Sequence, residues 1–86
     1  MNTFPLIISS PDGDLFRGDV GMIILRGTEG ELAILAGHIP FVTAIVPGRC
    51  VIVTGEDERK EGTIAGGLLT VDKDKVTVLT TALDIA

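Results

Sequence analysis

Short apolar runs, each ended by a turn rich in glycine, proline or aspartate, follow one another along the whole sequence of 86 residues. No segment keeps the i, i+3, i+4 spacing of apolar residues that defines an amphipathic helix. Runs of this length between such turns are typical of β-strands. The pattern therefore predicts an all-β chain of roughly ten short strands, folded as a two-sheet sandwich or a small barrel.

The boundaries of these strands follow from the turn residues. Gly18 and Gly21 interrupt the strand that begins at Leu15, which predicts a bulge or a bend there. Gly66 and Gly67 predict a corner at which the chain passes from one sheet to the other. The charged run 56–61 is interpreted as the solvated tip of a hairpin, with a docking patch as the alternative. The expected strands are residues 4–9, 22–25, 32–36, 41–46, 49–54, 63–65, 68–71 and 76–79, with a last short pairing at 83–85.

Residues 27–47 carry the polar side chains most suited to binding. A turn with two carboxylates, Glu29 and Glu31, is followed by an apolar run, a second turn with the sequence's single histidine, His38, and another apolar run. We expect these three side chains to project from one end of the sandwich, because loops on a rigid scaffold often carry function. The alternative is structural: His38 caps its own turn and the glutamates are merely solvated.

The apolar content exceeds what so small a domain can bury. Hydrophobic residues make up 45% of the sequence, and it has 11 glycines. The mean hydropathy is +0.48, yet no apolar run approaches the roughly 18–20 residues that cross a membrane. Residues 22–25 are apolar on both faces of the expected strand. We therefore favour an outward apolar face covered by a permanent partner over a sandwich that is merely tightly packed.

Charge and cysteine content exclude several classes of function. The net charge of −5 argues against nucleic acid, which demands a basic surface. Three phenylalanines with no tryptophan or tyrosine leave little for base stacking. The single cysteine, Cys50, cannot form an internal disulfide, and its apolar strand indicates a buried, inert thiol. Met1 to Thr3 lack the basic start of a signal peptide.

The sequence offers no catalytic constellation. One histidine and one cysteine cannot furnish a typical zinc site, and a pair of His38 with Cys50 has no third group to orient it. Neither GxxxxGK[ST] nor GxGxxG is present, so no phosphate-binding loop is supported. We predict no catalytic, cofactor-binding or metal-ligating residues and no cofactor.

The order of residues in this central stretch is also that of a known family. GTEGELAILAGHIPFVTAIVPG closely resembles the block G-[ST]-E-G-E-x-G-I-x-P-G-H-x-P-[LF]-[VL]-T-A-I-x-P-G near the start of the epsilon subunit of F-type ATP synthases. The flanks agree in PDGDLFRG, GTIAGGLLTV and KVTVL. Ala33 and Ala36 stand where the family has glycine and proline. The resemblance covers essentially the whole sequence, residues 1–86, as one N-terminal β-sandwich domain.

The resemblance implies a mechanical function. A non-catalytic central-stalk subunit couples the ring of c subunits to the gamma shaft during proton-driven ATP synthesis, without binding a nucleotide. It is peripheral on the cytoplasmic face of the bacterial plasma membrane, or on the thylakoid stromal face, and does not insert. The rival hypothesis is a free-standing β-sandwich that binds a small ligand or peptide. The implied rotor-ring contacts are Glu29, Gly30, Glu31 and His38, and the implied gamma contacts are Ser10, Phe41, Thr43 and Ile45.

In this family a C-terminal helical hairpin usually follows, and this sequence stops where that hairpin should begin. A natural short form and a trimmed chain both stay open. We expect the 86-residue form to support coupling without inhibiting ATP hydrolysis through the hairpin.

Overall fold

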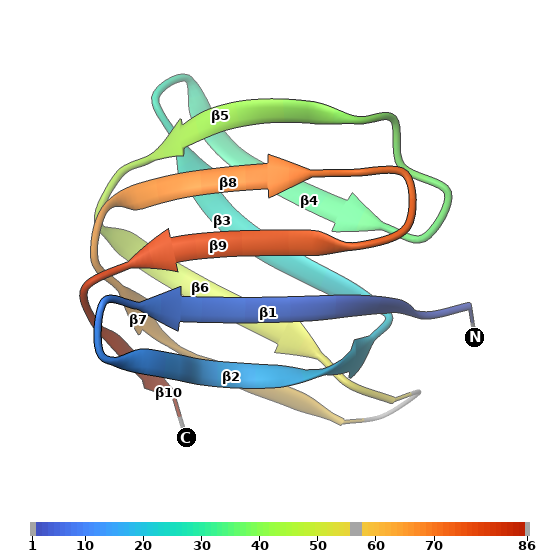
Figure 1. Ribbon diagram of the computed structural model, residues 1–86, viewed down its shortest axis with the longest axis horizontal. Helices are drawn as coiled ribbons and strands as arrows, with labels where there is room; N and C mark the ends of the chain where they lie inside the picture. Colours follow the sequence, from blue (N-terminus) through green and yellow to red (C-terminus); the bar gives the residue numbers. More distant parts are fainter. Residues whose placement is uncertain (1, 56–57, 86) are drawn as a thin grey trace.

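The computed structural model describes residues 2–55 and 58–85, and within these ranges it contains ten strands and no helix (Figure 1). The all-β prediction is therefore confirmed. The strands are β1 (Phe4–Ser10), β2 (Gly13–Val20), β3 (Met22–Gly27), β4 (Gly30–Leu35), β5 (Phe41–Ile45), β6 (Gly48–Val53), β7 (Arg59–Ile64), β8 (Gly67–Val71), β9 (Val76–Thr80) and β10 (Leu83–Ile85).

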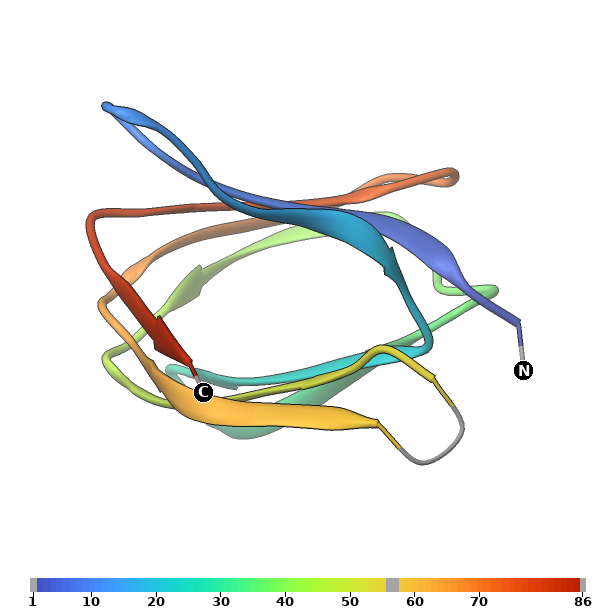
Figure 2. The ribbon, with the colours of Figure 1, turned by 90° about the horizontal axis from the view of Figure 1, so that it is seen from below.

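The strands form two layers that face each other across the core (Figure 2). The first layer has the order β5-β8-β9-β1-β2, in which β1 runs parallel to β9. The second layer has the order β10-β7-β6-β3, with β4 paired to the other side of β3. The layers are continuous only where Gly27 of β3 pairs with Ile45 of β5. This is the predicted two-sheet sandwich.

Bends in the chain carry it from one layer to the other. Pro47 stands between β5 and β6, and Gly66 stands between β7 and β8. A Cβ atom at Gly66 would lie 3.1 Å from the carbonyl oxygen of Ile45, so this corner has room only for glycine or a slightly shifted backbone. The buried hydroxyl of Thr80 is 3.1 Å from the carbonyl oxygens of both Ala65 and Gly66, to which it can donate. The predicted corner at residues 66 and 67 is confirmed.

The hairpin predicted around the charged run is also present, because β6 and β7 pair antiparallel from Gly48 with Ile64 to Val53 with Arg59. Residues 56 and 57 of its predicted tip lie outside the described residues. The bulge was expected at the wrong residue: Gly18 pairs regularly with Leu6, and the register shifts where Ile8 faces Phe16 but Ser9 faces Asp14. The extra residue is thus Leu15. Gly21 does form a bend, between β2 and β3.

Alternation along the strands decides which side chains enter the core. In β3, Ile23 and Leu25 are fully buried and point inward, whereas Met22 and Ile24 are half-buried on the outward side. The prediction of two apolar faces for this strand is therefore confirmed. The core consists of Phe4, Leu6, Ile8, Val20, Ile23, Leu25, Ile34, Ile45, Cys50, Ile52, Ile64, Leu69, Val71, Val76 and Val78.

Candidate interaction surface

The turn between β3 and β4 presents two carboxylates. Gly30 has φ +124°, a conformation that side chains rarely tolerate, so glycine is needed for the tight reversal. Glu29 is exposed at the turn. Glu31 begins β4 on its outward side, in register with Arg26. Its carboxylate lies 3.6 Å from the guanidinium of Arg49 on β6, so one of the predicted contact residues already has an ion pair within the chain.

The loop between β4 and β5, residues 36–40, is tied to a distant part of the chain. Gly37 has φ +84° and turns the loop. The Nδ1 atom of His38 is 2.8 Å from the carbonyl oxygen of Leu35, and its Nε2 atom is 2.6 Å from the carbonyl oxygen of Asp72. The ring also meets Phe4 edge to face, with 5.3 Å between ring centroids. His38 does cap its own turn, and the second contact, 34 residues away, was not foreseeable from local sequence.

The expectation that Glu29, Glu31 and His38 project from one end of the sandwich is wrong. Glu29 precedes β4 and His38 follows it, so the two loops lie roughly 17 Å apart along a six-residue strand. Figure 1 shows the two connections at opposite ends of β4. Within the described residues β4 pairs with β3 alone. The three side chains therefore flank a free sheet edge, which forms one side of the molecule rather than an end.

An ion-pair network on the outward face of the second layer was missed by sequence reasoning. Arg49 contacts Glu31 at 3.6 Å and Glu61 on β7 at 3.3 Å. Glu61 in turn lies 3.6 Å from Arg59 on the same strand. All four side chains are about half exposed. Alternation along each strand could have indicated their common outward side, but not which strands are neighbours.

The outward face of the first layer is apolar across three neighbouring strands. We define the apolar strip as Val42 and Ala44 on β5, Leu68 on β8 and Leu79 on β9. Ala44 pairs with Leu68, and Leu68 pairs with Leu79, so their side chains share one face. Val42, Leu68 and Leu79 are 62%, 41% and 51% exposed. Within the described residues, this is the largest set of exposed aliphatic side chains on adjoining strands.

The predicted gamma contacts lie close to this strip, but not all of them lie on it. Thr43 and Ile45 alternate with Val42 on β5 and so take the inward side of that strand; Ile45 is buried in the core. Phe41 is exposed at the start of β5, and Ser10 lies at the β1–β2 turn, where its hydroxyl can donate to the carbonyl oxygen of Gly13. The contact assignment stays a prediction, and Val42 is the outward residue that best represents it.

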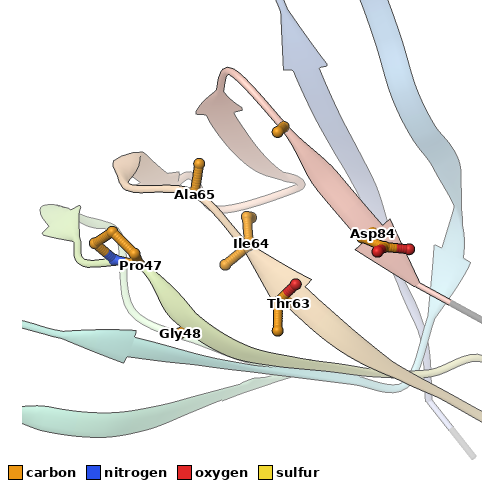
Figure 3. A pocket seen from close by; sticks show the side chains of 7 residues that line it. Pro47, Gly48, Thr63, Ile64, Ala65 and Asp84 are labelled. Atoms are coloured by element: carbon orange, nitrogen blue, oxygen red, sulfur yellow. The ribbon is translucent and has the colours of Figure 1, made fainter.

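A hollow of about 490 Å³ lies where Pro47, Ile64 and Ala65 approach the end of the sandwich (Figure 3). Its lining is aliphatic and backbone, with one carboxylate, Asp84, at its border. A ligand site usually adds several convergent polar groups to an apolar lining. This hollow therefore gives little support to a small-ligand site.

The described residues contain no group of three or more His, Cys, Asp or Glu side chains that could hold a metal ion. Cys50 is fully buried, and burial raises the pKa of its thiol to about 11. Hydrogen bonds from Ser9 and Arg17 hold the pKa of the exposed Asp14 carboxyl below its usual value. In residues 2–55 and 58–85 no helix long and apolar enough to cross a membrane is found.

Comparison with known proteins gives a consistent family. A profile described as "ATP synthase, Delta/Epsilon chain, beta-sandwich domain" matches residues 3–84. The epsilon chain of the sodium ion specific ATP synthase of Acetobacterium woodii is 39% identical over 82 residues, covering 95% of this chain and 62% of that relative. The epsilon chain from Alkalihalophilus pseudofirmus is 36% identical over 85 residues, covering 99% and 63%. The chain thus spans about three fifths of the length of the curated relatives it matches.

Solved structures agree on the fold. A chain in the OSCP/F1/c-ring part of the Euglena gracilis mitochondrial ATP synthase superposes with a TM-score of 0.85 at 24% identity, covering 98% of this chain and 52% of that one. A chain in the central stalk/c-ring part of the Tetrahymena thermophila enzyme gives 0.74 at 16% identity, covering 99% and 66%. At these identities the likeness shows the fold alone.

Proposed function

Because the chain belongs to the family of the β-sandwich domain of ATP synthase delta and epsilon chains, we propose that it is a non-catalytic part of the central stalk of an F-type ATP synthase. There it ties the gamma shaft to the ring of c subunits, so that rotation driven by ion flow reaches the distant nucleotide sites. It binds no nucleotide or cofactor, and it lies at the cytoplasmic membrane surface through its partners.

The observation that carries this proposal is the apolar strip. Its side chains are large and substantially exposed, and β5, β8 and β9 carry no charged residue within their strands. Such a patch on a small soluble domain is typical of a protein interface. A permanent contact with gamma would remove this surface from water, and the hydrophobic effect would hold the two subunits together.

The edge of β4 suits the second contact, with the rotor ring. Glu29, Gly30 and Glu31 lie at one end of this edge, and the loop 36–40 lies at the other. The polar loops of the ring present arginine in this family, and a carboxylate facing arginine gains charge-assisted hydrogen bonds. A strand edge gives two separated points of contact, which resist twisting between stalk and ring better than one.

A free-standing binding module remains the rival hypothesis. It would need a built pocket, and the hollow beside Asp84 offers one polar side chain that points to its border. The apolar strip, in contrast, spans three strands and lacks concavity, which fits a flat protein partner better than a small ligand.

The test is binding of the chain to the gamma subunit of the same synthase, measured by calorimetry. Val42→Arg puts a charge into the middle of the strip, so affinity should fall at least about tenfold, because a desolvated, unpaired charge is costly. The matched control is Thr63→Lys, an exposed outward residue of the second layer in register with Asp84. Gamma binding that Val42→Arg leaves unchanged, or that Thr63→Lys reduces equally, would contradict the proposal.

A further inference from the structure

The imidazole of His38 has two hydrogen-bond acceptors and no donor facing its nitrogens. Nδ1 lies 2.8 Å from the carbonyl oxygen of Leu35, and Nε2 lies 2.6 Å from the carbonyl oxygen of Asp72. Carbonyl oxygens only accept. A neutral imidazole carries one N–H, whereas the imidazolium carries two. Only the protonated ring can therefore satisfy both contacts at once, and the neutral ring leaves a nitrogen lone pair against an oxygen.

The surroundings do not supply a competing charge of either sign. The turn that His38 reaches contains Asp72, Lys73, Asp74 and Lys75, whose formal charges cancel. The end of β4, the loop 36–40 and the described start of β1 contain no ionisable group apart from His38 itself. The two carbonyl oxygens are thus the groups that respond to the proton on the ring.

The contact joins elements that belong to different layers. Leu35 ends β4 in the second layer, whereas Asp72 follows β8 in the first layer. Phe4, which meets the ring edge to face, belongs to β1. His38 is therefore turned inward, as a fastening between loop and turn. The side chain that the loop turns to solvent is the next one, Ile39, which is 81% exposed.

We propose that His38 is a proton-dependent positioning residue: the doubly protonated ring fastens the loop 36–40 to the turn 72–75 and thereby holds Ile39 ready for the rotor ring. The inference rests on the proposed function for the identity of the partner, but not for the fastening itself. It separates two roles that the sequence assigned to one residue. Ile39 makes the contact, and His38 fixes where that contact is made.

The fastening is tested on the chain alone. Because the sequence contains one histidine, the ring nitrogens can be observed by nitrogen-15 NMR without ambiguity. Across the range in which histidine titrates, both nitrogens should carry protons on the acid side, and exchange protection of amides in the loop and the turn should fall as the ring loses a proton. In His38→Gln this protection should be low at every pH. A neutral ring at pH 6, or protection that ignores the ring's charge, would overturn the proposal.

The consequence for docking is tested on a gamma–c-ring subcomplex at pH 6.0 and pH 8.0. Loss of one hydrogen bond changes an equilibrium about threefold to tenfold, so the chain should bind more tightly at pH 6.0 by about that factor. His38→Gln should bind like the neutral form at both values. Ile39→Ser should bind more weakly than the unaltered chain at both values, yet keep the pH dependence.

These outcomes separate the two levels of the argument. If the unaltered chain fails to bind the subcomplex at either pH, the proposed function fails, while the NMR result still decides on the fastening. If it binds normally and His38→Gln keeps the same affinity and pH dependence, the positioning role fails, while the proposed function stands. Equal binding by Ile39→Ser would show that Ile39 makes no contact and would also overturn the inference.

Discussion

The two layers differ most in what they turn to solvent. The first layer shows an uncharged strip over β5, β8 and β9, with charged side chains appearing on β2 at its edge. The outward face of the second layer instead places Arg26, Arg49, Arg59 and Glu61 on three neighbouring strands. Both layers follow the same alternation, so the difference comes from which residues occupy the outward positions.

Val51 shows what the charged side chains achieve. It lies on the outward side of β6, beside Ile24 and Glu61 in register, and yet it is fully buried. Long arginine and glutamate side chains can cover apolar surface with their aliphatic stems while their charged ends stay in water. The second layer thus covers part of its own apolar surface, and the first layer does not. This is why we assign the permanent apolar partner to the first layer.

The largest expected effect tests how firmly each layer is closed. A Cβ atom at Gly67 would overlap the carbonyl oxygen of Leu79, and one at Gly62 would overlap that of Asp84. Strands β8 and β9 both lie inside the first layer, whereas β10 is a three-residue strand at the edge of the second. Gly67→Ala should therefore cost about 3 kcal/mol or more of unfolding free energy, and Gly62→Ala about 1–2 kcal/mol, because β10 can move away.

Urea denaturation of both variants measures this difference. Gly18→Ala is the matched control, because the nearest atom to its added Cβ would be 3.8 Å away, an ordinary contact. It should change stability by no more than about 0.5 kcal/mol. Equal losses for Gly67→Ala and Gly62→Ala would mean that β10 is held as firmly as the interior strands, which would remove this contrast between the layers.

Local sequence predicted most of the strands, because turn residues and apolar runs act within a few positions. It also predicted the corner at Gly66 and the buried Cys50. It could not predict the arrangement around β4, because β5 pairs with β8 in the other layer rather than with its predecessor. The contacts of His38 with Asp72 and of Arg49 with Glu31 depend on the same long-range pairing. The bulge was misassigned to Gly18 because the extra residue, Leu15, has no sequence signature.

The next largest effect concerns Cys50, on the inward side of the second layer. Burial raises the pKa of its thiol to about 11 from 9.0, so at pH 8 the thiolate should be about a hundredfold rarer than in the unfolded chain. Reaction with a thiol-specific reagent should be slow and should speed up with unfolding. Gly62 is in register with Cys50, so Gly62→Ala should raise the rate where Gly18→Ala does not. A fast reaction in the unaltered native chain would mean that the second layer opens readily.

The raised pKa also sets a pH dependence of stability. The folded state favours the neutral thiol, so its contribution is fully present below pH 9 and is lost as pH rises from 9 towards 11. Between these values the unfolding free energy of the unaltered chain should fall more steeply than that of Cys50→Ala. The comparison uses slopes rather than absolute values, because removing the sulfur also leaves a small cavity. Parallel slopes would contradict the buried state of the thiol.

The smallest effect tests whether the charges of the second layer serve the chain or its partner. Arg49 is shared between Glu31 and Glu61, and each of these pairs is half exposed, so Arg49→Gln should cost at most about 1 kcal/mol of unfolding free energy. The same substitution frees the Glu31 carboxylate for an arginine of the rotor ring, so docking should strengthen by no more than about fivefold. Arg59→Gln is the control, since it contacts Glu61 without contacting Glu31; it should leave docking unchanged. Weaker docking of Arg49→Gln would instead mean that Arg49 itself belongs to the contact. In that case the second layer, like the first, would depend on a partner to complete its outward face.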